Sequence, residues 1–469
     1  MFNLAKIFTT QEQSETLQKE QIASLLKTSP EALEAFETAY QMQSLTEVSD
    51  NFFDVNAKTA SALLPKSAPS ICPDKMVDRI VDELLGKTKV LVYKDNQLST
   101  ITFPTPDLPP VTPADLADID KEDMPQLTGD YGMRDMPGSG AAVLFFYQRM
   151  LSAKNAKEKK FYYDHFRQGL DILDIDPILY EIIGTNRNSM GYWLPPLLEG
   201  VKHQGFFRVP ETSVVKIPIP LLQLTRLPYD GLHPSTIKIL DRYCMRAFNL
   251  DVRKDYFIKT GTYSSKYDFR NAKVTGEKEV RELGEYLLFI HFQACQMASP
   301  FTEPAVIYGV STTNEWVVRE FIPDRAKLPC IYNGMPLRTE YRVFVDFDAK
   351  TVLGMNPYWD PDVMKQRFGH ERDANSPHQL HDYVIYRTRE DDMMDEYHRN
   401  EPLIREKIGE MLGYVPLEGQ WSIDIMQDGS DFYIIDMALA ANSALSECVP
   451  AGLLKPLEEN WLPKIPESQ

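Results

Sequence analysis

Two aspartates near the C-terminus of the sequence are its best candidates for chemistry. Asp424 lies in the apolar stretch SIDIM and Asp436 in YIIDMA, on either side of an Asp-Gly pair that predicts a tight turn. The two carboxylates of such a hairpin face each other, and burying them is costly unless they are paired, hydrogen-bonded or bound to a metal. With the amide of Asn442 they form an oxygen-rich set that suits Mg²⁺ when phosphates complete its coordination. The alternative is a half-exposed hairpin with both carboxylates in solvent.

A second candidate site is a polar loop that follows an expected buried strand. Residues 255–273 read DYFIKTGTYSSKYDFRNAK, with one glycine, several hydroxyl groups and lysines at 259 and 266. Backbone N–H groups and hydroxyls can donate to the oxygens of a nucleotide polyphosphate, and the ammonium groups of Lys259 and Lys266 can neutralise its charge. Because threonine, serine and lysine are common in loops, an ordinary polar turn is an equal alternative.

Two further apolar segments contain an arginine. In residues 316–323, WVVREFIP, the backbone could form the hinge of an adenine site with apolar side chains around it, although a core strand with an exposed Arg319-Glu320 ion pair fits equally well. Arg342 lies in the middle of TEYRVFV. A buried guanidinium there needs an anion, and a phosphoryl group in transfer would be one.

The order of these four segments resembles the ATP-grasp superfamily. Within it, the closest similarity is to the cell-division-cycle proteins that help assemble eukaryotic translation initiation factor two, and to their bacterial and phage relatives. IKTGTYSSKYDFRNA is similar to that family's lysine, Ser-Ser and Lys-Asp loop, TEYRVFV to its Glu-Phe-Arg strand, and SIDIMQDGSDFYIIDMALAANSAL to its Asp hairpin. The resemblance extends over residues 206–450, a little over half of the chain.

The resemblance implies where ATP would bind. Lys259 would contact the α- and β-phosphates and would be catalytic together with Arg342, which would face the γ-phosphate or a phosphorylated intermediate. The loop over the nucleotide would contain Gly261, Ser264, Ser265 and Lys266. The adenine hinge would consist of Arg319, Glu320, Phe321 and Ile322.

The resemblance also implies a metal site. Asp424 and Asp436 would hold Mg²⁺. The sequence departs from the family pattern at Ala438, where an asparagine is expected. Asn442 would replace that ligand if the loop after the hairpin bends back.

These roles imply an ATP- and Mg²⁺-dependent carboxylate–amine ligase that acts through an acyl phosphate, with the carboxylate and the amine unidentified. The alternative is an ATP-binding assembly factor or chaperone for a protein partner, without a ligase product. A third possibility is nucleic-acid ligation through lysine adenylation. It is disfavoured because the sequence Lys266-Tyr267-Asp268-Phe269 lacks the glycine of the Lys-x-Asp-Gly motif and because the chain is acidic.

The elements that must position these residues follow an α+β pattern. We expect strands at 213–219, 255–261, 305–310, 315–322, 339–348 and 350–359, a hairpin at 420–438, and helices at 235–249, 276–297 and 399–413. Antiparallel groups of strands with helices between them indicate the α+β class, and the resemblance indicates two subdomains around a nucleotide cleft.

The first two hundred residues contain no motif that suggests chemistry. Helices are expected at 32–42 and 73–86, and a hairpin around Asp95-Asn96 at 89–103. We therefore expect four parts: an N-terminal helical region with a small hairpin at 1–103, a Pro-rich linker or surface excursion at 104–140, a helical connector at 141–205, and the ATP-grasp domain at 206–469.

Composition limits the function classes. The chain has 469 residues, 43% of them hydrophobic, so buried cores are expected, and its net charge of −18 disfavours binding to duplex nucleic acid. Its five cysteines include no CxxC pair, and His378 and His381 favour a surface loop over a metal site. The sequence has no apolar run of roughly eighteen residues and no signal sequence, so we expect a cytoplasmic protein that does not span a membrane.

Overall fold

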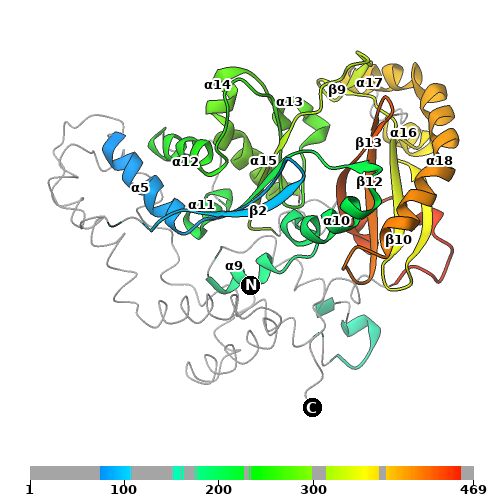
Figure 1. Cartoon of the computed structure of the whole chain (residues 1–469), viewed down its shortest axis with the longest axis horizontal. Helices are drawn as coiled ribbons and strands as arrows, with labels where there is room; N and C mark the ends of the chain where they lie inside the picture. The colour runs from blue at the N-terminus through cyan, green and yellow to red at the C-terminus, as the bar shows by residue number, and fades with distance from the viewer. Residues whose placement is uncertain are drawn as a thin grey trace.

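The computed structural model describes residues 74–105, 107, 150, 153–159, 161–162, 175, 177–226, 232, 234–297, 313–368 and 377–455 (Figure 1). The helix expected at 32–42 and the strand expected at 305–310 lie outside these residues, as do most of the expected linker at 104–140 and most of 141–173.

Within the described residues a six-stranded sheet, here called sheet A, has the order β2-β1-β4-β7-β5-β6. All its neighbouring strands are antiparallel. The strands are β1 (Lys89–Lys94), β2 (Gln97–Thr102), β4 (Thr212–Lys216), β5 (Tyr256–Thr260), β6 (Lys273–Val274) and β7 (Glu315–Glu320).

A five-stranded sheet, here called sheet B, has the order β11-β10-β12-β13-β3. Its strands are β3 (Phe207–Arg208), β10 (Glu340–Asp346), β11 (Thr351–Pro357), β12 (Gln420–Asp428) and β13 (Asp431–Leu439). Only the β13–β3 pair is parallel. A separate two-stranded ribbon pairs β8 (Cys330–Ile331) with β9 (Met335–Pro336).

Helices cover both sheets, so the expected α+β class is confirmed. Figure 1 shows α12, α14 and α15 on the side of sheet A and α18 along sheet B. The α-helices are α5 (Asp74–Gly86), α9 (Pro177–Gly184), α10 (Met190–Gln204), α11 (Ile219–Gln223), α12 (Pro234–Ala247), α13 (Phe269–Ala272), α14 (Gly276–Arg281), α15 (Leu283–Met297), α16 (Pro361–Phe368), α17 (Pro377–Arg387) and α18 (Glu390–Leu412). None of these described helices combines the length and the apolar character needed to cross a bilayer.

Two helices differ from expectation. The helix expected at 276–297 is two helices, because the Asp241 carboxylate accepts a hydrogen bond from the Glu285 N–H at 2.9 Å and so satisfies the first turn of α15. Helix α18 begins nine residues before the expected 399, at Glu390, where three acidic residues occupy its first turn. Pro402 lies inside α18.

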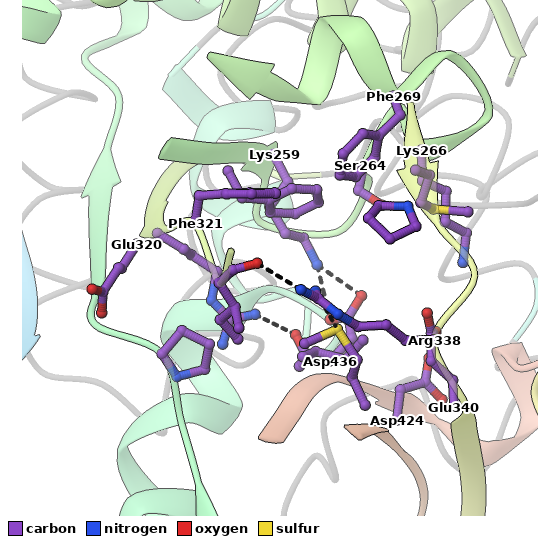
Figure 2. Close-up of a pocket in the computed structure, with 18 residues that line it drawn as sticks. Lys259, Ser264, Lys266, Phe269, Glu320, Phe321, Arg338, Glu340, Asp424 and Asp436 are labelled. Atoms are coloured by element: carbon purple, nitrogen blue, oxygen red, sulfur yellow. Dashed lines mark hydrogen bonds and ion pairs between the residues drawn. The ribbon is translucent and has the colours of Figure 1, made fainter. Parts of the chain in front are cut away.

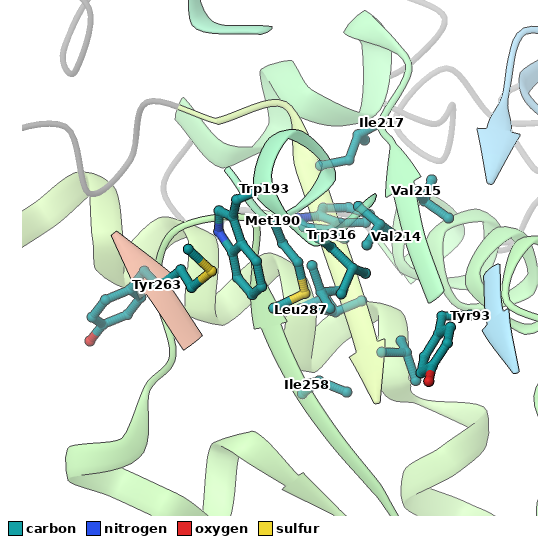
Figure 3. Packing of buried hydrophobic residues seen from close by; sticks show 14 of the residues in the cluster. Tyr93, Met190, Trp193, Val214, Val215, Ile217, Ile258, Tyr263, Leu287 and Trp316 are labelled. Atoms are coloured by element: carbon teal, nitrogen blue, oxygen red, sulfur yellow. The ribbon is translucent and has the colours of Figure 1, made fainter. Parts of the chain in front are cut away.

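The expected boundary between 1–103 and 206–469 does not separate the sheets. The predicted hairpin is present, with positive φ angles of 51° at Asp95 and 60° at Asn96, but β1 pairs with β4 in sheet A. It joins this sheet because Val90 and Tyr93 are buried in the main core. Figure 3 shows the same core around Trp193, which comes from α10 in the expected connector and packs near Trp316 of β7.

Candidate functional site

A pocket lies where the two sheets meet, and its volume, including the part open to solvent, is about 840 Å³ (Figure 2). Sheet A contributes β5, β7 and the segments after them, whereas sheet B contributes β10, β12, β13 and the segment before β10. Most of the residues singled out from the sequence line it: Lys259, Ser264, Lys266, Arg319, Glu320, Phe321, Ile322, Asp424 and Asp436.

A partly buried ion pair crosses from one sheet to the other in this pocket. The Nζ of Lys259 donates to both carboxylate oxygens of Asp436, at 2.8 Å each. The Lys259 side chain is 2% exposed and that of Asp436 is 36% exposed. Burial lowers the pKa of Lys259, and the Asp436 carboxylate opposes this shift.

Asp424 is the Cα partner of Asp436 across the β12–β13 hairpin, so the expectation that the two carboxylates face each other is confirmed. Asp424 is also opposite Arg342 on β10, whose Nε and Nη2 donate to its two oxygens at 2.8 and 2.7 Å. Asp424 is buried, so the alternative of a carboxylate in solvent is wrong for this residue. A bidentate pair of this kind satisfies both charges.

Arg319 and Glu320 point to opposite faces of β7, as the two-residue period of a strand requires. Glu320 is exposed, whereas Arg319 is buried and donates to Thr212 Oγ1 at 3.1 Å and to the backbone oxygen of Ile435. Burial lowers the pKa of Arg319 to about 10, and Asp436 opposes the shift. The alternative of an exposed Arg319-Glu320 ion pair is therefore wrong.

The other half of the pocket is apolar. The centroid of the Phe269 ring lies 6.0 Å from the ring centroid of Phe257 and 6.3 Å from that of Phe321. Ile322, Met335, Pro336 and Met426 extend this surface. Sequence analysis missed Phe257 and Phe269. Phe257 could have been found, because it is two residues before Lys259 and so lies on the same face of β5.

Two residues of the expected nucleotide loop do not line the pocket. The N–H of Gly261 donates to the backbone oxygen of Glu315 at 2.9 Å, and a Cβ at this glycine would lie only 2.5 Å from Thr313 Oγ1. Ser265 donates to Gln293 Oε1 at 2.9 Å. Both residues therefore hold the segment after β5 against its neighbours instead of pointing at the cavity.

Two other expected residues also lie outside the lining. Asn442 follows β13, and its Oδ1 accepts a hydrogen bond from Asn188 Nδ2 at 3.0 Å. Arg342 lies beside the pocket, where Asp424 and the ring of Tyr358, 4.8 Å from its guanidinium carbon, contact it. Asn442 is not among the residues that line the pocket, although the segment after β13 returns toward Arg342, whose Nη1 donates to the backbone oxygen of Ala444 at 3.2 Å.

Two pocket residues, Glu340 and Arg338, were missed by sequence analysis. Burial and the nearby Asp424 raise the pKa of Glu340 to about 7, and Lys266 opposes this shift. Glu340 could have been found from its spacing of two residues from Arg342 on the same strand. Arg338 lies outside any strand, so the spacing of residues on a strand could not have pointed to it.

The described residues contain no group of three or more His, Cys, Asp or Glu side chains arranged to hold a metal ion. The two expected ligands are instead held by cations, Asp424 by Arg342 and Asp436 by Lys259. As arranged, the site does not fit a metal ion held by the protein alone.

Comparison with known proteins gives limited similarity. No protein-family model and no curated protein matches the chain. Solved structures of Cdc123 from Schizosaccharomyces pombe and of its C-terminally truncated form match 58% of this chain and 89% of theirs, at 14% sequence identity. Their TM-scores are 0.30 for the first and 0.31 for the truncated form.

Proposed function

We propose that the pocket between sheets A and B binds ATP, that the two sheets form an ATP-grasp type of cleft, and that the chain is an ATP-binding assembly factor for a protein partner. The observation that carries the proposal is the division of one cavity into an aromatic half and a cationic half.

The two halves match the two parts of a nucleotide. Phe257, Phe269 and Phe321 offer aromatic surface to a planar base, to which stacking contributes about 1–3 kcal/mol in other proteins. Lys259 and Lys266 offer ammonium groups, and Ser264 offers a hydroxyl, to phosphate oxygens.

The surroundings of Arg342 favour an assembly factor over a ligase. The ligase hypothesis depended on a guanidinium in an apolar strand that needs an anion from the substrate. Asp424 supplies that anion through two hydrogen bonds of 2.8 and 2.7 Å. Arg342 therefore needs no phosphoryl group to balance its charge. Its position in an apolar strand no longer favours phosphoryl transfer.

We further propose that Mg²⁺ enters together with ATP. Lys259 and Arg342 already pair with the two carboxylates that would be ligands of Mg²⁺. The phosphate oxygens of ATP compete with these carboxylates for the two cations. Titration calorimetry should then detect no binding of Mg²⁺ alone, whereas Mg²⁺ should strengthen the binding of ATP. Tight binding of Mg²⁺ without nucleotide would contradict this order.

A thermal-shift experiment tests nucleotide binding directly. ATP at about one hundred times its dissociation constant stabilises a protein by about 2.7 kcal/mol. We expect a clear rise in Tm with millimolar ATP and none with an equal concentration of inorganic sulfate. The absence of any response to ATP, with or without Mg²⁺, would refute the proposal.

Two measurements separate an assembly factor from a ligase. ATP-dependent co-purification of a defined protein partner, which a Lys259→Met substitution abolishes, would support the assembly factor. Mass spectrometry of reactions with ATP and a panel of amino acids and peptides would detect an amide product with stoichiometric ADP. Such a product would restore the ligase hypothesis.

A further inference from the structure

Three cationic side chains cross between the sheets inside the pocket. Lys259 of sheet A reaches Asp436 of sheet B, and Arg319 of sheet A reaches the backbone oxygen of Ile435. The third, Arg338, precedes β10 of sheet B, and its Nη2 donates to the backbone oxygen of Ile322 at 2.9 Å. Ile322 follows β7 of sheet A, so this contact crosses in the opposite direction.

The surroundings of Arg338 suit a positive charge poorly. The residue is 5% exposed, and its Nη1 points to Met426 Sδ at 3.4 Å, a weak acceptor. Its Nε has no hydrogen-bond acceptor among the described residues, and the Oδ1 of Asp428 lies 3.7 Å away from it. Asp428 is thus a buried counter-charge at ion-pair distance, but the Nε of Arg338 donates no hydrogen bond to it.

The other buried guanidinium that lines the pocket, that of Arg319, also has a nitrogen without an acceptor among the described residues, its Nη2. Lys259 in the pocket and Arg342 beside it are better satisfied. Asp436 accepts two hydrogen bonds from Lys259, and Asp424 accepts two from Arg342. In Figure 2 the side chain of Arg338 extends across the pocket toward the segment that contains Phe321. An anion in this cavity would therefore gain more from the guanidinium of Arg338 than from Lys259 or Arg342.

We propose that Arg338 binds the phosphates of the ligand, exchanging its contact with Ile322 for a charge-assisted contact with a phosphate oxygen. This inference rests on the proposed nucleotide site and adds a phosphate-binding residue to it. It also means that binding of the phosphates removes one of the contacts that join sheet A to sheet B.

The test compares ATP with adenosine by titration calorimetry on the full chain. Arg338→Met keeps a side chain of similar length next to Met426 and Ile322 and removes the charge. We expect its affinity for ATP to fall about tenfold or more, because a hydrogen bond between charged groups is lost, while its affinity for adenosine changes less than about twofold. Arg338→Lys should lose less ATP affinity than Arg338→Met.

A matched control removes another arginine of the same sheet. Arg208 pairs with Asp431 at 3.0 Å on the exposed side of sheet B, so Arg208→Gln should leave both affinities unchanged. Equal losses for ATP and adenosine in Arg338→Met would indicate a purely structural role and overturn the inference. No loss in either charge variant, or a gain in ATP affinity, would also overturn it.

The same data keep the two proposals apart. If the unmodified chain binds adenosine and ATP but the Arg338 variants do not lose more affinity for ATP than for adenosine, the nucleotide site is supported and the proposed role of Arg338 is refuted. If the unmodified chain binds neither, both proposals fail. Should Arg338→Met not fold, as judged by urea denaturation, the comparison of Arg338→Lys with the unmodified chain decides the outcome.

Discussion

Sheets A and B bring charges of opposite sign to the pocket. The two strands of sheet A that line it contribute the buried cations Lys259 and Arg319, whereas the strands of sheet B contribute the carboxylates of Glu340, Asp424 and Asp436. Within sheet B, Arg342 balances Asp424, but the charge of Lys259 is balanced only across the interface. The buried charge of Lys259 therefore has its counter-charge only while the two sheets are in contact.

The largest predicted effect comes from replacing Asp436, the more exposed residue of the Lys259–Asp436 pair. Asp436→Asn leaves the buried Lys259 without its counter-charge and should lower the free energy of unfolding by about 3 kcal/mol. Lys259→Met should cost less, because Asp436 is 36% exposed and can be hydrated. Urea denaturation of both variants measures the difference, and equal losses would contradict the asymmetry.

The second prediction concerns pH and sheet B. The pKa of Glu340 is raised to about 7 in the folded protein, above the 4.5 of a free carboxyl group, so the folded state binds more protons between these two pH values. Stability should therefore fall as pH rises from about 4.5 to about 7. Glu340→Gln removes this dependence and should be more stable than the unmodified chain at pH 8, by roughly 1–3 kcal/mol.

Urea denaturation at pH 5 and pH 8 checks this sign. The unmodified chain and Glu340→Gln should have similar stability at the lower pH and differ at the higher one. A variant that is less stable at pH 8 would show that the carboxylate is stabilised by its neighbours Lys266 and Arg338 instead of being destabilised by burial.

The third prediction compares the aromatic half of the pocket with the charged half. Phe269→Ala should weaken the binding of adenosine and of ATP by a similar factor of about tenfold, because base stacking on an aromatic ring contributes about 1–3 kcal/mol. A loss confined to ATP would place the phosphates, and not the base, beside this ring. Titration calorimetry with both ligands distinguishes the two outcomes.

The smallest predicted effect is at the surface of sheet B. Arg208 and Asp431 form an ion pair of 3.0 Å in which the arginine side chain is 59% exposed. Exposed pairs of this kind contribute about 0–1 kcal/mol, so Arg208→Gln should change the free energy of unfolding by less than about 0.5 kcal/mol. A loss of unfolding free energy close to that of Asp436→Asn would mean that the two ion pairs, Arg208–Asp431 and Lys259–Asp436, do not differ in strength because of burial.

Local sequence patterns predicted the elements of the site well. The Asp-Gly pair correctly predicted the turn of the β12–β13 hairpin, where Asp428 pairs with Asp431. A register shift between Asp424 and Ile425, which the sequence did not predict, then places Asp424 opposite Asp436. Strand alternation also placed β5, β7 and β10 to within a residue or two. The α+β class followed from the same patterns.

The partners of the charged residues could not be predicted in this way. Lys259 and Asp436 are 177 residues apart in sequence, and no local pattern encodes a contact between two sheets. The same limit explains why an exposed Arg319-Glu320 pair remained an equal alternative to an adenine hinge. It also explains why the contact of Asn442 with Asn188, 254 residues away, was not predicted.

The pairing of β1 with β4 has a practical consequence for recombinant fragments. A fragment that begins at residue 206 would keep the pocket residues but lose β1, which pairs with β4 over Val90↔Val215 to Tyr93↔Thr212. The backbone groups of β4 would then face solvent along an uncovered edge, and such edges promote self-association. Fragments intended for crystallisation or binding studies should therefore retain the hairpin from Lys89 to Thr102.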